Sequence, residues 1–342
     1  MSVLFFHFDG TCNAPSDAYA PPNADESISN VLKSHLLLGG ELDNSNGRLS
    51  IPSSNRSFYY AGVGTYGSAL ERWLNAGFAF ENADVANILQ RALLDFQCHY
   101  HVKIEAIVLI GFSRGAALAR RFAALINPFV QGAVVIEAVM DTVASIGWPN
   151  LDKTQRPTHD VVFEYGCHLP RCVKHALHLV ALDEQRLAFR PTLMNHDARV
   201  TELWMPGVHS DVGGGFRQDS LADLSFGTIA RWLQRTLKSH RTTLYHPVER
   251  LPLFNRDSST YQYWSELLEM TPSVTAPAHY QQRFGHFAKA TLAPRRCHVL
   301  KGNTPCEKTH PLWHRSVFKR MAQQPYQPVA ILQKPALGWC HY

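Results

Sequence analysis

Residues 111–115 read Gly-Phe-Ser-Arg-Gly and place a serine between two glycines. A continuous apolar run over 104–111 predicts a buried strand before this serine, and alanine-rich sequence over 114–126 predicts a helix after it. A strand that turns sharply into a helix is the context of a nucleophile elbow, which presents the serine hydroxyl above the sheet. We therefore predict Ser113 as a nucleophile. The backbone N–H of Arg114, at the start of the helix, is the predicted oxyanion donor.

A serine nucleophile needs a base and an acid that orients the base, and in this arrangement the chain order is serine, acid, histidine. Asp141 directly follows the apolar run 133–140, and His209 follows a predicted strand over 200–206. Because the carboxyl ends of parallel strands meet at one edge of a sheet, both side chains are expected near Ser113. We predict His209 as the general base and Asp141 as its orienting acid.

Other residues compete for these two roles. The chain has 18 histidines, but His209 heads a glycine-rich turn that ends at Gly215 and can hold an imidazole at a fixed angle. Asp183 is a rival acid that we expect to support the fold through local hydrogen bonds. Asp211 is a second rival, and its side chain points away from that of His209 if the segment is extended.

The loop that ends the first strand, residues 9–11, is a candidate for the second oxyanion donor. The backbone N–H of Gly10 or Thr11 would point at the developing negative charge. The alternative is a plain turn in which the carboxylate of Asp9 caps local N–H groups.

Two other classes of protein stay open. In a metal-dependent phosphohydrolase, acidic and histidine side chains at strand ends would gather a divalent ion, and the candidates are Asp9, Asp141, His209 and Asp211. In a non-catalytic binding module on a hydrolase fold, Ser113 would be inert. The complete serine, acid and histidine set favours the serine enzyme over both, with no cofactor and no metal.

Alternating strands and helices define the fold class. Strands are predicted over 3–8, 57–62, 104–111, 133–140 and 200–206, and helices over 28–38, 82–99, 114–126 and 221–238. Ser27 is the predicted cap of the first helix. This alternation predicts an α/β protein of α/β-hydrolase type, with a mostly parallel central sheet and helices on both faces. We divide it into a core over 1–241 and an irregular C-terminal extension or cap over 242–342, packed on the core.

Composition excludes several classes. Of the 342 residues, 45% are hydrophobic and 18% are charged, which permits a large core and argues against global disorder. The net charge of +5 is spread along the chain, which is typical of an ordinary solvated surface and is also compatible with an anionic membrane surface. No nucleic-acid motif accompanies it. The first residues lack the basic start of a signal peptide, so we expect synthesis in the cytoplasm.

Several segments together resemble a family first catalogued as an uncharacterised α/β-hydrolase domain, which includes phospholipase effectors of the bacterial type VI secretion system. The resemblance rests on FDGTCN (8–13), YYAGVGT (59–65), GFSRGAALAR (111–120), MDTVASIG (140–147), HALHLVALDEQR (175–186) and MPGVHSDVGGGF (205–216). The serine, aspartate and histidine of the family coincide with Ser113, Asp141 and His209.

The resemblance implies a phospholipase A-like enzyme that hydrolyses acyl esters of glycerophospholipids. In effector members of the family the target is the membrane of a competing bacterium, which implies secretion into a target cell and a partner in the secretion apparatus. It also implies an immunity protein that protects the producer. An esterase acting on soluble esters is the alternative, since it would share every catalytic residue and differ only in the pocket.

Overall fold

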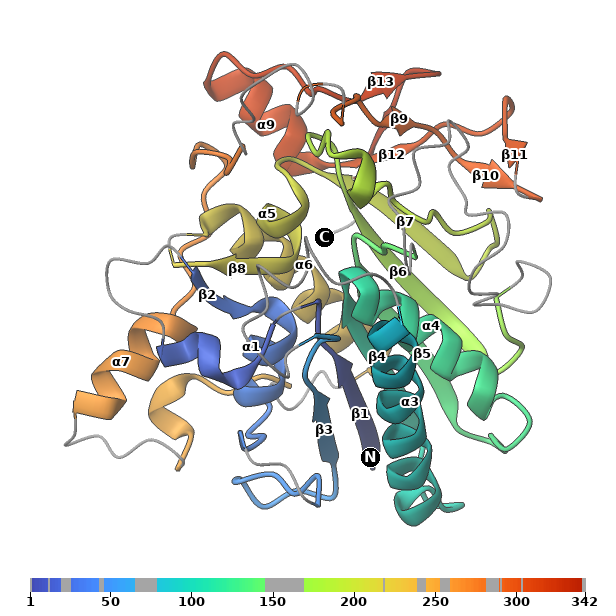
Figure 1. Cartoon of the computed structure of the whole chain (residues 1–342), viewed down its shortest axis with the longest axis vertical. Helices are drawn as coiled ribbons and strands as arrows, with labels where there is room; N and C mark the ends of the chain where they lie inside the picture. Colours follow the sequence, from blue (N-terminus) through green and yellow to red (C-terminus); the bar gives the residue numbers. More distant parts are fainter. Residues whose placement is uncertain are drawn as a thin grey trace.

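A computed structural model of the chain describes residues 2–11, 13–19, 26–42, 46–64, 79–144, 169–217, 219–238, 244–252, 259–280, 289, 291–302 and 304–339. Its centre is an eight-stranded sheet in the order β14-β12-β7-β6-β5-β4-β1-β3, and every neighbouring pair is parallel (Figure 1). The strands are β1 (Val3–Phe8), β3 (Arg56–Tyr60), β4 (Ala106–Phe112), β5 (Val134–Met140), β6 (Val173–Ala181), β7 (Val200–Met205), β12 (Leu312–His314) and β14 (Leu337–Trp339).

The remaining elements surround this sheet. The helices are α1 (Asn30–Leu37), α3 (Ala79–His99), α4 (Ser113–Ile126), α5 (His209–Gly213), α6 (Ser220–Thr236), α7 (Ser259–Leu268) and α9 (Arg315–Gln323), with single turns η1 (Pro15–Tyr19), η3 (Leu187–Phe189) and η4 (Val248–Arg250). Three small pairings join β2 (Glu26–Ser29) to β8 (Gly214–Phe216), β9 (Arg296–Cys297) to β13 (Ile331–Leu332), and β10 (Leu300–Lys301) to β11 (Thr304–Pro305).

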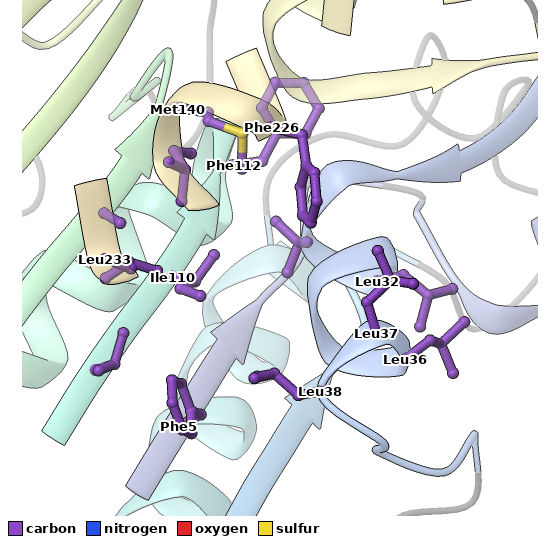
Figure 2. Close-up of a cluster of buried hydrophobic side chains, with 14 of the residues drawn as sticks. Phe5, Leu32, Leu36, Leu37, Leu38, Ile110, Phe112, Met140, Phe226 and Leu233 are labelled. Atoms are coloured by element: carbon purple, nitrogen blue, oxygen red, sulfur yellow. The ribbon is translucent and has the colours of Figure 1, made fainter. Parts of the chain in front are cut away.

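Apolar side chains leave both faces of the sheet, which is why helices must cover both. On one face, Phe5 and Ile110 pack against Leu32 of α1 and against Phe226 and Leu233 of α6 (Figure 2). On the other face, the second cluster joins strand residues to α3 and α4, and includes Phe6, Phe8, Leu89, Phe96 and Phe122. Burying each of these side chains contributes about 1.5–3 kcal/mol. The predicted fold class, a parallel sheet with helices on both faces, is therefore confirmed.

All nine predicted elements are present with shifted ends, but four features differ from the sequence analysis. Helix α1 begins after Ser29, whose side chain accepts a hydrogen bond from Leu32 N at 3.1 Å, so the predicted cap at Ser27 is wrong. Strand β6 was not predicted, because Lys174, His175 and His178 interrupt its apolar pattern. The other two differences are helix α5 at His209, where a turn was predicted, and the contribution of residues beyond 242 to the sheet.

Strands β12 and β14 come from the segment that was predicted to be an irregular extension. Each has three residues, which is too short for a periodic pattern in the sequence. They extend the sheet beyond β7 in parallel register, and Trp313 lies opposite Trp204. Figure 1 shows β12 at this end of the sheet. The boundary near residue 242 remains a prediction, although the central sheet crosses it.

Within the part of the chain that the structure describes, every helix is too short or too polar to span a lipid bilayer.

A buried histidine, His35, makes stability depend on pH. Its Nε2 donates to the carbonyl of Glu41 at 2.9 Å and its Nδ1 accepts from Ser57 Oγ at 2.7 Å, which defines a neutral tautomer. Burial lowers the pKa of His35 to about 4, so in acid the unfolded chain takes up a proton before the folded chain does. This contribution to stability is complete above about pH 6.5 and is lost as the pH falls toward 4.

We therefore expect His35→Asn to lose less stability than the wild type on acidification. When the pH falls from about 7.5 to 5, the free energy of unfolding in urea should fall by about 2 kcal/mol more for the wild type than for His35→Asn. His101→Gln, at an exposed histidine, is the control and should keep the slope of the wild type. Parallel curves for wild type and His35→Asn would contradict the assignment.

Candidate active site

Ser113 occupies a strained turn between β4 and α4. Its φ is +56°, and a positive φ is unfavourable for a residue with a side chain. Among the described residues, three that are not glycine have a positive φ. The flanking glycines explain how the turn closes. A Cβ on Gly115 would lie 2.1 Å from the carbonyl oxygen of Phe8, and one on Gly111 would lie 2.6 Å from the Cα of Ala116. The structure thus gives residues 111–115 the geometry of a nucleophile elbow.

Asp141 and His209 are in direct contact. Asp141 follows β5 with a φ of +38°, and His209 is the first residue of α5, after β7. The Nδ1 of His209 donates to Oδ2 of Asp141 at 2.5 Å, and both residues are buried. The imidazole is also held between two rings, with its centroid 4.6 Å from that of Phe112 and 4.8 Å from that of Phe189. Its orientation is therefore fixed from three sides.

Ser113 is joined to this pair by its neighbours. The carbonyl oxygen of Ser113 accepts a hydrogen bond from the N–H of Val143, two residues after Asp141, at 3.1 Å. The residue before it, Phe112, carries the ring that lies against His209. The three residues predicted from the sequence thus meet at one edge of the sheet, and the assignment of roles to them remains a prediction.

Arg295 is the residue of this site that sequence reasoning missed. It comes from the segment beyond residue 242, is buried, and donates from Nη1 and Nη2 to the two oxygens of Asp141 at 2.7 and 2.8 Å. It also donates to the carbonyl oxygens of Ala181 and Phe189. No motif surrounds Arg295 in the sequence, and only the tertiary fold reveals its partner.

These contacts set the charges of the pair. Burial opposes ionisation of Asp141, but the Arg295 guanidinium and the hydrogen bond from His209 outweigh it and hold the pKa of Asp141 well below its ordinary value. Burial lowers the pKa of His209, and the adjacent carboxylate of Asp141 only partly offsets this. At neutral pH the arrangement is an ionised acid next to a neutral imidazole, which is the state that a general base requires.

The loop of residues 9–11 reaches Ser113. A Cβ on Gly10 would lie 3.4 Å from the Cβ of Ser113, so the loop and the elbow are in contact. The N–H of Gly10, one of the three predicted oxyanion donors, donates to Oδ1 of Asp9 at 2.7 Å. The predicted alternative, capping by Asp9, is present in the same loop.

Asp9 is the anchor of that loop. Its Oδ2 accepts hydrogen bonds from Ser29 Oγ and from the hydroxyl of Tyr59, both at 2.7 Å, and Asn13 donates to Oδ1. Burial raises the pKa of Asp9 despite these three donors and the N–H of Gly10. The side chain is fully engaged in holding the backbone beside Ser113.

The rival acids have other partners. Asp183 accepts from the N–H of Gly207, from the hydroxyl of Tyr326 and from the N–H of Val329, so it supports the fold through contacts far along the chain. Asp211 pairs with His279 at 2.6 Å. Across the described ranges, the acidic and histidine residues spaced for a metal ion are Asp211, Asp219 and His279, a set that omits Asp9, Asp141 and His209.

The fold and this edge of the sheet define the class of protein. An all-parallel sheet, helices on both faces and a strained serine between a strand and a helix are the features of the α/β-hydrolase fold.

The chain belongs to the family of catalytic domains of Tle1-like phospholipase effectors of the type VI secretion system, whose model matches residues 3–130 and 130–235. The resemblance stated from the sequence motifs is thereby confirmed. No curated protein matches the chain.

Several solved structures are similar at low identity. The Tle1 effector bound to the VgrG spike from the type VI secretion system is 23% identical over 63% of this chain and 51% of that one, with a TM-score of 0.38. An uncharacterized protein from Pseudomonas aeruginosa is 20% identical over 67% and 45%, with a TM-score of 0.39. Carboxyl esterase 2 from the fungus Tuber melanosporum is 11% identical over 72% and 78%, with a TM-score of 0.36. The chain spans about half the length of the first two, and none of these likenesses carries an argument about function.

Arg295 gives a test of how the pair is held. We expect Arg295→Gln to lower kcat/KM for a p-nitrophenyl ester by about 10²-fold, because Asp141 loses its orientation and much of its charge compensation. Without the guanidinium, the acid limb of the pH–rate profile should move to higher pH. The carboxylate of Asp141 then stabilises the imidazolium of His209 more strongly and raises its pKa.

Arg295→Lys is the matched variant, because it keeps the positive charge and loses the two-pronged contact. Its acid limb should stay near that of the wild type even where its rate falls. A profile of Arg295→Gln with the same acid limb as the wild type would show that Arg295 acts on folding alone.

Proposed function

We propose that this chain is a serine hydrolase that cleaves acyl esters of glycerophospholipids, a phospholipase A-like enzyme. The observation that carries the proposal is the buried His209–Asp141 pair beside the strained turn of Ser113. The substrate class comes from the family, which is one of phospholipase effectors. The net charge of +5 is compatible with an anionic lipid surface.

The reaction follows from these positions. Ser113 Oγ attacks the acyl carbonyl carbon while the unprotonated Nε2 of His209 takes the hydroxyl proton. The ester C–O bond then breaks, and His209 returns the proton to the departing lysophospholipid oxygen. Water, activated by the same imidazole, hydrolyses the acyl-serine and releases the fatty acid. Asp141 stabilises the imidazolium in both steps, and the N–H groups of Arg114 and Thr11 stabilise the oxyanion.

We also propose that the chain acts as an antibacterial effector that is delivered into a target cell. The Tle1 effector was solved bound to a VgrG spike, and a spike protein of the same kind is the secretion partner that we propose here. A cognate immunity protein in the producing cell belongs to the same proposal. Both partners follow from family membership and from no contact in this structure.

The direct test compares wild type with Ser113→Ala on vesicles of mixed bacterial phospholipids. We expect the wild type to release fatty acid and lysophospholipid, and the variant to lose about 10⁴-fold or more of the rate. The reaction should persist in chelator, because no chemical step uses a metal. Ser53→Ala, at an exposed serine outside the site, should retain full activity.

The alternatives predict other outcomes in the same assay. A soluble-ester hydrolase would cleave a short-chain ester without any rise in rate when the substrate passes into micelles. A metal-dependent phosphohydrolase would be inactivated by chelator and unaffected by Ser113→Ala. A non-catalytic module would release nothing, and a serine-directed phosphonate would not label Ser113.

A further inference from the structure

Three side chains gather next to the turn that carries His209. They are Asp211 in α5, Asp219 at the start of α6, and His279 in the segment that precedes Arg295. Each offers one potential ligand atom, and these atoms all lie within 4.8 Å of one another. The proposed hydrolytic reaction uses none of the three.

One carboxylate oxygen of Asp219 is buried without a hydrogen-bond partner among the described residues. Its Oδ1 accepts from the N–H of Ala222 at 3.1 Å and caps α6. Its Oδ2 is buried and has no hydrogen-bond partner among the described residues, although the residue is only 9% exposed. Burying a carboxylate oxygen in this way costs free energy unless a positive charge or a donor compensates it.

The other two members are already positioned. His279 Nδ1 lies 2.6 Å from Oδ1 of Asp211, and the imidazole ring stacks on Phe216 with centroids 4.0 Å apart. Asp211 is fully buried, and its Oδ2 accepts from the N–H of Val208 at 2.8 Å. The stacked ring fixes the direction of Nδ1, so an ion between the three residues would replace the proton that Nδ1 now shares with Asp211.

The surroundings admit a cation. Asp219 lines a cavity of about 350 Å³ together with Asp223, Glu266 and Glu269. Lys33 and Arg217 also line it, and Lys33 is neutralised by an ion pair with Asp223 at 2.8 Å. Burial and the nearby Asp211 raise the pKa of Asp219 to about 7, so a bound cation would release a proton near neutral pH.

We propose that Asp211, Asp219 and His279 form a site for a divalent transition metal, with Zn²⁺ as the ion that the donor set suits. One imidazole and two carboxylates match the nitrogen and oxygen ligands of zinc, whereas Ca²⁺ requires six to eight oxygens. Tetrahedral zinc with bonds of about 2 Å joins ligands roughly 3.3 Å apart. The three ligand atoms here already lie within 4.8 Å of one another.

The ion would act on structure rather than on the substrate. Asp211 lies two residues after His209 in α5, Asp219 begins α6, and His279 belongs to the segment between α7 and Arg295. A metal at this point would tie these three parts of the chain together and hold the helical turn from which His209 projects. No metal was predicted from the sequence, and of the four residues weighed there as ligands of a divalent ion only Asp211 belongs to this site.

The test measures binding and is independent of hydrolysis. Protein stripped with chelator is titrated calorimetrically with Zn²⁺, and separately with Ca²⁺, in wild type, Asp219→Asn and Glu266→Gln. Asparagine keeps the cap of α6 and removes the charge of the orphaned carboxylate. Glu266→Gln removes a charge from the same cavity but lies outside the cluster, which makes it the matched control.

We expect the wild type and Glu266→Gln to bind one more equivalent of Zn²⁺ than Asp219→Asn, with protons released, and to show a rise in Tm that this variant lacks. Equal stoichiometry and affinity in all three proteins would overturn the proposal. Loss of a Ca²⁺ equivalent in place of Zn²⁺ would overturn the choice of metal. If Asp219→Asn does not fold, His279→Gln, at a partly exposed position, provides the same comparison.

Discussion

The contact on which the candidate site depends is the two-pronged hydrogen bond of Arg295 to Asp141. Burial without compensation raises the pKa of a carboxylate and leaves its direction unfixed, and both effects weaken its hold on an imidazole. The guanidinium of Arg295 removes that penalty, and the N–H of Ala181 adds a further donor to the same carboxylate. Breaking such a buried pair typically costs about 3–5 kcal/mol, so the site and the stability of the fold share this interaction.

Much of the core could be predicted because its strands follow simple rules. Strands β1, β4 and β5 read as mostly apolar runs, with one polar residue in β1 (His7) and one in β5 (Glu137), since both of their faces are covered by helices or neighbouring chain. Ser113 and Asp141 directly follow β4 and β5, and His209 lies shortly after the end of β7. The topology of a parallel sheet therefore places them at one edge, and the strand end together with the glycine-rich turn singled out His209 as the predicted base among 18 histidines.

The features that could not be predicted from the sequence depend on tertiary contacts. Strand β6 contains His178, a polar residue that breaks the apolar pattern, yet it is fully buried because its Nδ1 donates to Glu202 at 2.9 Å and its Nε2 accepts from Thr142 N. Strands β12 and β14 are too short for any periodicity. Neither Arg295 nor His279 is part of a helix or strand, and their partners are far away in the chain.

The order of these segments along the chain has a consequence for the growing protein. Strands β1, β3, β4, β5, β6 and β7 can associate as soon as residues up to about 205 have been made. Ser113 and Asp141 are present by that point, and His209 follows shortly after it. Arg295 is synthesised much later. Until it arrives, the carboxylate of Asp141 lacks its counter-charge and the two donors that fix its direction toward His209. The nascent chain would therefore carry all three predicted catalytic side chains before the contact that orients them exists, and that contact forms only when the final third of the chain folds onto the sheet.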